Sequence, residues 1–237
     1  MRRDYIRLHA DVAEMNPRVD SSLEQIFFSH KGLPCDKWFH YLSVYEQHLG
    51  RFKQKPVRLL EIGVQHGGSF QMWRSYLGAA AILHGIDIES KPHAISGLQA
   101  VGAVFHEGDQ CDEDLLKRIV GEMGGVDVVI DDGGHHSSQQ ITTFESLYPL
   151  LDKNGVYLCE DTHTSYWSEY GGGLQHPNSF VEYAKRRVDD LYSWYADGID
   201  SDVFALSTKS VLFYDSMVVF EREDRSEPKR YVVGSPL

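Results

Sequence analysis

Cysteine is scarce in this sequence, and long apolar segments are absent. The three cysteines, Cys35, Cys111 and Cys159, lie far apart and form no CxxC pair, which favours a reducing compartment such as the cytoplasm. No apolar run approaches the ~20 residues of a membrane-spanning helix. The Arg2–Arg3 start is not followed by the apolar core of a secretory signal. We therefore expect a cytoplasmic protein without a membrane partner.

Positive charge is the second shortage. The chain carries 23 Lys and Arg against 35 Asp and Glu, a formal net charge of −12, and contains no basic block. Nucleic acid is therefore not expected as a partner, and neither is an anionic membrane surface. A small anionic molecule remains compatible, because one pocket can differ in charge from the whole surface.

Internal repeats and low-complexity linkers are also missing. With 237 residues, 42% of them apolar, the chain suits one large domain with an added segment. Helical spacing occurs at 20–30, with a capping-type start at Asp20–Ser22, and again at 36–50. We therefore divide the chain into a helical N-terminal extension, 1–50, packed on or exchanged with the core, and a domain over 51–237.

Beyond residue 56, short apolar runs alternate with helical patterns. Strands are expected at 57–63, 81–88, 103–109, 126–132 and 155–161, and helices at 69–78, 111–123, 139–151 and 178–197. A terminal hairpin is expected at 210–224. This alternation predicts a doubly wound, Rossmann-like α/β fold, with a mostly parallel sheet and an antiparallel terminal hairpin.

Each of the first five expected strands ends in an acidic residue. These residues are Glu61, Asp87, Asp109, Asp131, Asp132, Glu160 and Asp161. Doubly wound sheets bind ligands at the carboxyl ends of their strands, so these side chains are the first candidates for a site.

The first two strand ends are typical of a nucleoside-binding site. LEIGVQHGGS, residues 60–69, combines a strand end, a Gly-rich turn and a helix start, and its glycines allow close approach of a ligand. Asp87 could accept hydrogen bonds from both hydroxyls of a ribose. The spacing is not the GxGxxG of dinucleotide-binding folds, which disfavours a dehydrogenase. Glu61 would repel a pyrophosphate and suits a cationic ligand.

This stretch resembles motif I of the class I S-adenosylmethionine-dependent methyltransferases. The resemblance implies that Glu61, Gly63, Gly67 and Ser69 lie around the amino-acid part of S-adenosylmethionine and that Asp87 holds the ribose.

Three more residues are implied on the cofactor side. Asp109 and Gln110, in EGDQCD, match the adenine-side motif, and Asp131 is a further candidate, with capping of the next turn or helix as its alternative. Lys31 and the tyrosines of the N-terminal helices could reach the methionine carboxylate, although helix packing also explains them.

The fourth and fifth strand ends predict a metal centre. Asp132, Glu160 and Asp161 follow strands that should be neighbours, so their carboxylates converge and need protons or a cation. An all-oxygen set suits a hard divalent cation, Mg²⁺ or Mn²⁺. His135 follows two glycines that let the chain turn back, and a neutral imidazole there is a candidate general base for a hydroxyl that the metal acidifies.

Two stretches together, VVIDDGGHHSSQQ and GVYLCEDTHTSYW, are similar to the metal-dependent sugar O-methyltransferases of macrolide and related pathways. The cephalosporin-pathway and rhamnosyl O-methyltransferases are similar too, and the likeness runs from about Lys31 to Phe220. It implies Asp132, Glu160 and Asp161 as Mg²⁺ ligands, His135 as the base, and a sugar hydroxyl of a glycoside or polyol as acceptor. We expect no counterpart of the large N-terminal domain that some of these enzymes carry, so the acceptor itself is not implied.

Four residues are candidates for substrate contact: His136, His163, Tyr166 and Trp167. Packing is the alternative for His136, and an orienting role is the alternative for His163. Aromatic residues of the N-terminal helices predict a symmetric homo-oligomer: Phe27, Phe28, Trp38 and Phe39.

Other functions stay open from the sequence. Methylation of a catechol or phenol would use the same sheet and a similar metal, although phenols need less help from a base. A regulatory module could bind S-adenosylmethionine without chemistry, but it would not need a full set of buried carboxylates, which are costly when unpaired.

Overall fold

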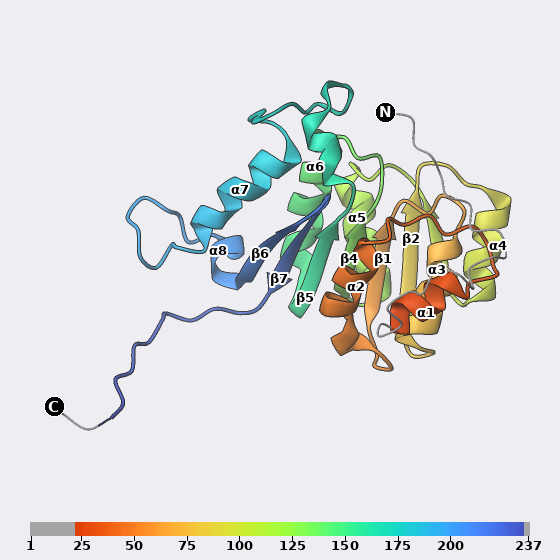
Figure 1. Ribbon diagram of the computed structural model, residues 1–237, viewed down its shortest axis with the longest axis horizontal. Coiled ribbons are helices and arrows are strands. Elements are labelled where there is room, and N and C mark those ends of the chain that lie inside the picture. The colour runs from red at the N-terminus through yellow and green to blue at the C-terminus, as the bar shows by residue number, and fades with distance from the viewer. Residues whose placement is uncertain (1–21, 235–237) are drawn as a thin grey trace.

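The computed structural model describes residues 22–234, which form a seven-stranded sheet with helices on both faces (Figure 1). The strands are β1 (Arg58–Ile62), β2 (Ile82–Asp87), β3 (Val104–Glu107), β4 (Val126–Asp131), β5 (Leu151–Cys159), β6 (Thr208–Tyr214) and β7 (Met217–Arg222). The α-helices are α1 (Ser22–Phe28), α2 (Tyr41–Leu49), α3 (Gly68–Leu77), α4 (Pro92–Ala100), α5 (Glu113–Met123), α6 (Ser137–Leu147), α7 (Phe180–Asp190) and α8 (Val203–Ser207).

The strand order is β3-β2-β1-β4-β5-β7-β6, and it confirms the predicted fold class. Strands β1 to β5 pair in parallel, whereas β7 is antiparallel to both of its neighbours, β5 and β6. In register, Ile62 lies beside Asp131, and Asp131 lies beside Cys159. The carboxyl ends of β1, β4 and β5 therefore reach the same level, where the acidic residues follow.

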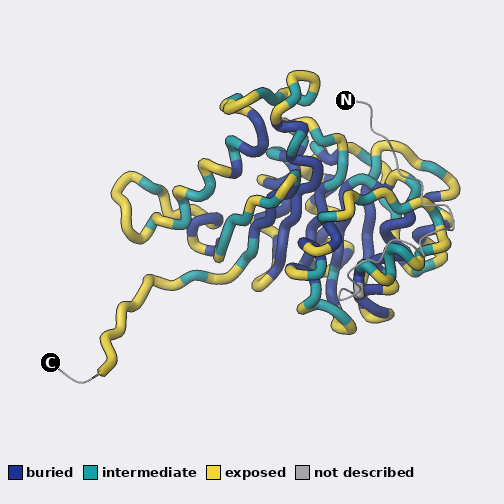
Figure 2. The backbone as a smooth tube through the Cα atoms, in the orientation of Figure 1, coloured by how far each residue is buried: buried dark blue, intermediate teal, exposed yellow. Residues whose placement is uncertain are grey.

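Alternate side chains of the central strands enter two separate cores. Leu59 and Val128 face the core under α1 to α4, whereas Leu60 and Val129 face the core under α5 to α8. Burial on both sides explains why these strands read as continuous apolar runs. Figure 2 shows the strands as the most buried part of the chain, with exposed connections around them.

Three predicted helix boundaries were wrong. The helix expected at 139–151 ends at Leu147, because a 3-10 turn with Pro149 follows and Leu151 begins β5. The helix expected at 178–197 ends at Asp190, because its buried side chains, Phe180, Val181 and Ala184, all belong to its first half. Beyond Asp190 nothing apolar anchors another turn, and Tyr195 is 70% exposed. Helices gain most of their stability from packing of an apolar face.

Helix α2 begins at Tyr41, not at residue 36, so residues 29–40 form an irregular connection from α1. Helix α4 was not predicted, because only Ala94, Gly97 and Leu98 are buried in it and no clear period results. Of the cap expected at Asp20–Ser22, Asp20 and Ser21 lie outside the described residues, and α1 begins at Ser22. Within residues 22–234, no helix is long and apolar enough to cross a membrane.

Candidate active site

Three carboxylates at the ends of β1, β4 and β5 surround one buried ammonium group. Lys37 Nζ lies 2.6 Å from Asp132 Oδ2, 3.0 Å from Glu160 Oε1 and 3.4 Å from Glu61 Oε1. The side chain of Lys37 is only 2% exposed. The irregular connection before α2 therefore delivers a cation to the centre of the predicted acid cluster.

Gly63 allows the ends of β1 and β4 to approach each other. It has a φ of +88°, and a Cβ atom there would lie 2.1 Å from the carbonyl oxygen of Asp132. No side chain fits that space, so glycine is required where the strand end turns. This contact brings the turn after β1 beside the acids after β4.

A second group of ligand-type atoms lies on the other side of Asp132. His135 Nε2 is 4.0 Å from Asp132 Oδ1 and 3.7 Å from Asp161 Oδ2. One ligand atom from each of these three residues lies within 4.8 Å of the others. Asp132 therefore faces Lys37 with one oxygen and His135 with the other.

Unusual backbone conformations hold this second group. His135 and Asp161 have φ values of +59° and +52°, in the left-handed region that few non-glycine residues adopt. The Thr164 hydroxyl lies 2.9 Å from the carbonyl oxygens of both residues and ties the two turns together. Strained backbone of this kind concentrates at functional sites.

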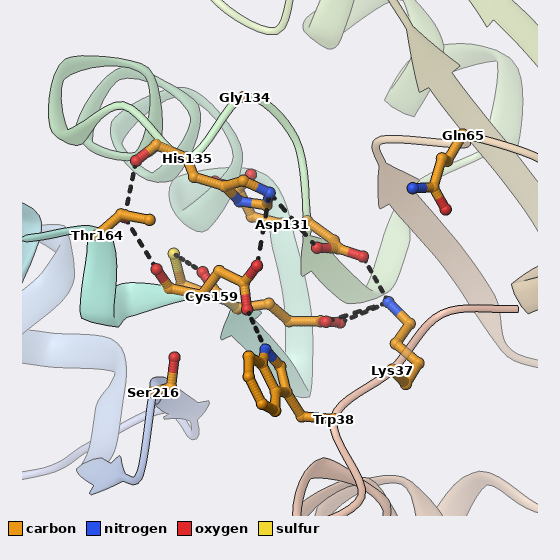
Figure 3. A network of polar contacts seen from close by, with 12 residues as sticks. Lys37, Trp38, Gln65, Asp131, Gly134, His135, Cys159, Thr164 and Ser216 are labelled. Carbon is orange, nitrogen blue, oxygen red and sulfur yellow. Dashed lines mark hydrogen bonds and ion pairs between the residues drawn. The ribbon is translucent and has the colours of Figure 1, made fainter. Parts of the chain in front are cut away.

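Asp161 is fixed from the N-terminal side of the chain. Trp38 Nε1 donates to its Oδ1 at 3.1 Å, and the Tyr41 hydroxyl donates to the same oxygen at 2.8 Å. The other oxygen stays directed toward His135. Figure 3 shows Lys37 and Trp38 reaching this network from one side and His135 and Thr164 from the other.

Neither Lys37 nor Trp38 was predicted as a site residue, and Trp38 was predicted only at an oligomer interface. Both fall within the apolar spacing at 36–50 that predicted a helix, and they lie 95 and 123 residues away in the chain from Asp132 and Asp161. The only signal was that DKW is a charged and aromatic stretch just before an aromatic helix. Lys31, which had been considered for the methionine carboxylate, is exposed.

Negative charge is in excess at this site. Burial raises the pKa of Glu61, and it raises the pKa of Asp132 and Glu160 as well, while the nearby Lys37 opposes each rise. Burial alone would lower the pKa of Lys37, but Asp132 and Glu160 raise it well above its usual value. One ammonium cannot balance three carboxylates together with Asp161, so the donor set fits an additional cation.

The residues at the ends of β1 and β2 that were predicted to bind the methyl donor are joined by hydrogen bonds around one turn. Asp87 Oδ2 accepts from the backbone N–H groups of Val64 and Gln65, at 2.8 and 2.9 Å. Ser69 Oγ donates to Glu61 Oε2 at 2.8 Å, which leaves Glu61 Oε1 directed toward Lys37. Gly67, with a φ of +83°, is the N-cap residue of α3. Asp87 thus shapes the turn, in addition to its predicted contact with a ribose.

Asp131 and Gln110 lie inside the protein. The Tyr157 hydroxyl donates to Asp131 Oδ2 at 2.9 Å, and Gln110 Nε2 donates to Asp131 Oδ1 at 3.2 Å. Burial raises the pKa of Asp131 to about 6. Gln110 Oε1 also accepts from the Gly134 N–H at 2.8 Å, so the pair supports the turn that carries His135.

Asp109 is exposed, and its Oδ1 accepts from the Cys111 N–H at 2.9 Å. Contacts of Asp109, Gln110 and Asp131 with a nucleoside stay predictions.

Aromatic rings form a rim beside Asp161. Ring centroids are 6.2 Å apart for Trp38 and His163, 4.8 Å for His163 and Trp167, and 5.8 Å for Trp167 and Tyr170. The rim continues to His136, whose ring lies 5.1 Å from that of Tyr170. Three predicted substrate residues thus belong to one rim.

The fourth substrate candidate, Tyr166, is 47% exposed in the same loop. His163 Nδ1 contacts Ser216 Oγ in the β6–β7 turn, which anchors the rim to the hairpin.

The sequence was compared with known protein families and with curated proteins. Residues 60–162 match a family model described as a methyltransferase domain. The chain is 33% identical over 215 residues to 8-demethyl-8-(2-methoxy-alpha-L-rhamnosyl)-tetracenomycin-C 3'-O-methyltransferase of Streptomyces olivaceus, covering 81% of this chain and 52% of that protein. It is 37% identical over 135 residues to mycinamicin VI 2''-O-methyltransferase of Micromonospora griseorubida, covering 54% and 33%. The chain spans about half the length, or less, of these curated relatives.

A solved structure shares the fold. It is the MycE methyltransferase of the mycinamycin pathway, in complex with Mg, SAH and mycinamycin VI, with a TM-score of 0.74 and 27% identity over 86% of this chain and 53% of that one. Residues 60–162 are thus similar to a methyltransferase domain, the fold is Rossmann-like α/β as in MycE, and the chain is similar to the sugar O-methyltransferases of antibiotic glycosides.

Proposed function

We propose that the protein transfers a methyl group from S-adenosylmethionine to a hydroxyl of a sugar on a natural-product glycoside, with Mg²⁺ or Mn²⁺ bound. The observation that carries the proposal is the position of Asp132 between two groups. One of its carboxylate oxygens contacts Lys37, which also contacts Glu61 on the proposed donor side, and the other faces His135. The names of the relatives, and the Mg and SAH of the MycE complex, support the cofactors and the acceptor class.

The ligands proposed for the divalent cation are Asp132, Glu160 and Asp161. The ion would acidify an acceptor hydroxyl and hold it beside the donor. His135 Nε2 faces the same space and accepts the proton as the hydroxyl oxygen bonds to the methyl carbon and the sulfur keeps the electron pair. His135 Nδ1 is buried, with no hydrogen-bond partner among the described residues, so these residues do not fix the tautomer of the ring.

The aromatic rim is the proposed acceptor platform. Trp38 and His163 of this rim both lie beside Asp161, and Trp38 is 47% exposed. Apolar ring faces suit the C–H faces of a sugar, while the acids suit its hydroxyls. Enclosure between the rim and the acids would orient one hydroxyl, and orientation is a major source of rate.

A product screen tests the proposal. The protein would be incubated with S-adenosylmethionine, either Mg²⁺ or EDTA, and a panel of deoxysugar glycosides and catechols. Mass spectrometry should find a gain of one methyl group on a glycoside, dependent on Mg²⁺. Methylation confined to catechols would overturn the acceptor class. Binding of S-adenosylhomocysteine without transfer to any acceptor would favour a regulatory module.

Asp87→Ala should weaken S-adenosylhomocysteine binding by about 1–3 kcal/mol, the loss of charge-assisted hydrogen bonds and of the turn that Asp87 holds. Calorimetry measures the affinity, and a thermal melt checks the fold. Glu89→Ala is the matched control, since it removes an exposed carboxylate two residues further on. An affinity equal to that of the wild type would remove Asp87 from the donor site.

The domain division, the location and the oligomeric state of the protein are further proposals. Residues 1–50 would form an extension, residues 51–237 the methyltransferase domain, and the protein would act in the cytoplasm as a symmetric homo-oligomer. Phe39 is 57% exposed beside Phe28, with ring centroids 5.9 Å apart, and offers an apolar contact. Light scattering at micromolar concentration should give a mass above that of one chain, and a monomer would contradict the proposal.

A further inference from the structure

Lys37 connects the two halves of the proposed site. Its Nζ lies 2.6 Å from Asp132 Oδ2 and 3.0 and 3.1 Å from the two Glu160 oxygens, all on the metal side. The same Nζ lies 3.4 Å from Glu61 Oε1, at the end of β1. The matched methyltransferase domain, residues 60–162, does not include Lys37.

A small cleft opens between the Lys37 segment and the turn after β1. Its lining consists of Pro34, Cys35, Asp36, Lys37, Glu61, Gly63, Val64, Gln65, Gly68, Ser69 and Asp132. Among these described lining residues, Lys37 is the only cation. A methyl donor whose amino-acid part lies in this cleft would bring its carboxylate toward the three acidic lining residues, Asp36, Glu61 and Asp132. Among the lining side chains, Lys37 alone carries a positive charge that can offset this repulsion.

A divalent cation and Lys37 compete for the same oxygens. A cation that uses Asp132 and Glu160 takes the carboxylates that now surround the ammonium, and two positive charges in one buried space repel each other. The lysine side chain is flexible, with three donors on a four-carbon stem. Its remaining acid partner, Glu61, lies in the cleft.

On the basis of the proposed function, we propose that Lys37 is a positioning residue shared by the metal site and the donor site. Without a divalent cation, its ammonium neutralises Asp132 and Glu160. With the cation bound, the ammonium is released toward the cleft and pairs with the carboxylate of the methyl donor. Metal and donor therefore favour each other, and the coupling is reciprocal.

Calorimetry of S-adenosylhomocysteine, with EDTA and with saturating Mg²⁺, tests this coupling in the absence of any acceptor. Wild-type affinity should rise with Mg²⁺ by about tenfold, within the usual 5- to 150-fold range of coupled sites. In Lys37→Met, donor binding should be weaker and the Mg²⁺ effect should fall below about twofold. Lys37→Arg should retain most of the effect. Lys55→Met, which removes an exposed lysine, should match the wild type.

Mn²⁺ binding measured without donor gives a readout that a purely structural lysine would not produce. Lys37→Met should bind Mn²⁺ at least as tightly as the wild type, because the competing ammonium is gone. If Lys37→Met does not fold, Lys37→Gln keeps a polar side chain beside the carboxylates and leaves the proposed metal ligands in place, and its donor affinity should still change less than about twofold with Mg²⁺.

Three results would overturn the inference: a wild type whose donor affinity ignores Mg²⁺, a Lys37→Met variant with unchanged coupling, or weaker Mn²⁺ binding in that variant. A wild type that binds no S-adenosylhomocysteine would instead overturn the proposed function.

Discussion

His135→Ala is expected to lower the methyl-transfer rate by roughly 10²–10⁴-fold, the usual contribution of a general base. The imidazole reaches the acid cluster only through Nε2, from a turn in the left-handed region that Gly133 and Gly134 precede. S-adenosylhomocysteine and Mn²⁺ should still bind with nearly wild-type affinity, because the donor turn and the proposed carboxylate ligands remain. Single-turnover kinetics, together with calorimetry, separates the chemical step from binding.

The neighbouring histidine provides the comparison. His136 is exposed and packs its ring on Tyr170, so His136→Ala should cost less than about tenfold and act mainly on KM, as loss of a substrate contact does. Full activity of His135→Ala at neutral pH with bound metal would make His135 a structural residue. His136 or His163 would then become the candidate base.

The sequence predicted what local patterns control. Apolar runs buried on both faces identified β1, β2, β4 and β5, whereas β3 at the edge of the sheet is only partly buried. The acids after the strands identified the edge of the sheet that carries the site. The hairpin followed from the two apolar runs on either side of Asp215 and Ser216.

Long-range contacts could not be predicted in the same way. Lys37 and Trp38 approach the acids through an irregular connection whose path depends on the packing of α1 and α2. Neither residue has a spacing relation to Asp132 or Asp161. For the same reason, the sequence treated the acid cluster as free for a metal, whereas the structure places an ammonium among three of its carboxylates.

Asp161→Asn is expected to weaken Mn²⁺ binding by at least about 100-fold, since even outer contacts of a metal site cost 10–100-fold. The substitution keeps the shape of the side chain and the hydrogen bonds from Trp38 and Tyr41 to one oxygen, but it removes the charge. Asp132→Asn should have a similar effect, and excess Mg²⁺ or Mn²⁺ should partly rescue activity. Mn²⁺ titration followed by electron paramagnetic resonance measures the affinity directly.

Asp131→Asn is the matched control, because it removes the same charge one residue before Asp132 from a side chain that contacts Tyr157 and Gln110 instead. Its Mn²⁺ affinity should fall by less than about tenfold, below the range for groups that support a metal ligand, because its carboxylate contacts Tyr157 and Gln110. Variants of Glu160 and His135 show which of these two residues is the third metal ligand. If Glu160 binds the metal, Glu160→Gln should weaken Mn²⁺ as Asp161→Asn does, while His135→Ala should not. The reverse result would make Asp132, His135 and Asp161 the ligands, leave Glu160 as the partner of Lys37, and remove His135 from the role of base, since a nitrogen that binds a metal cannot accept the proton.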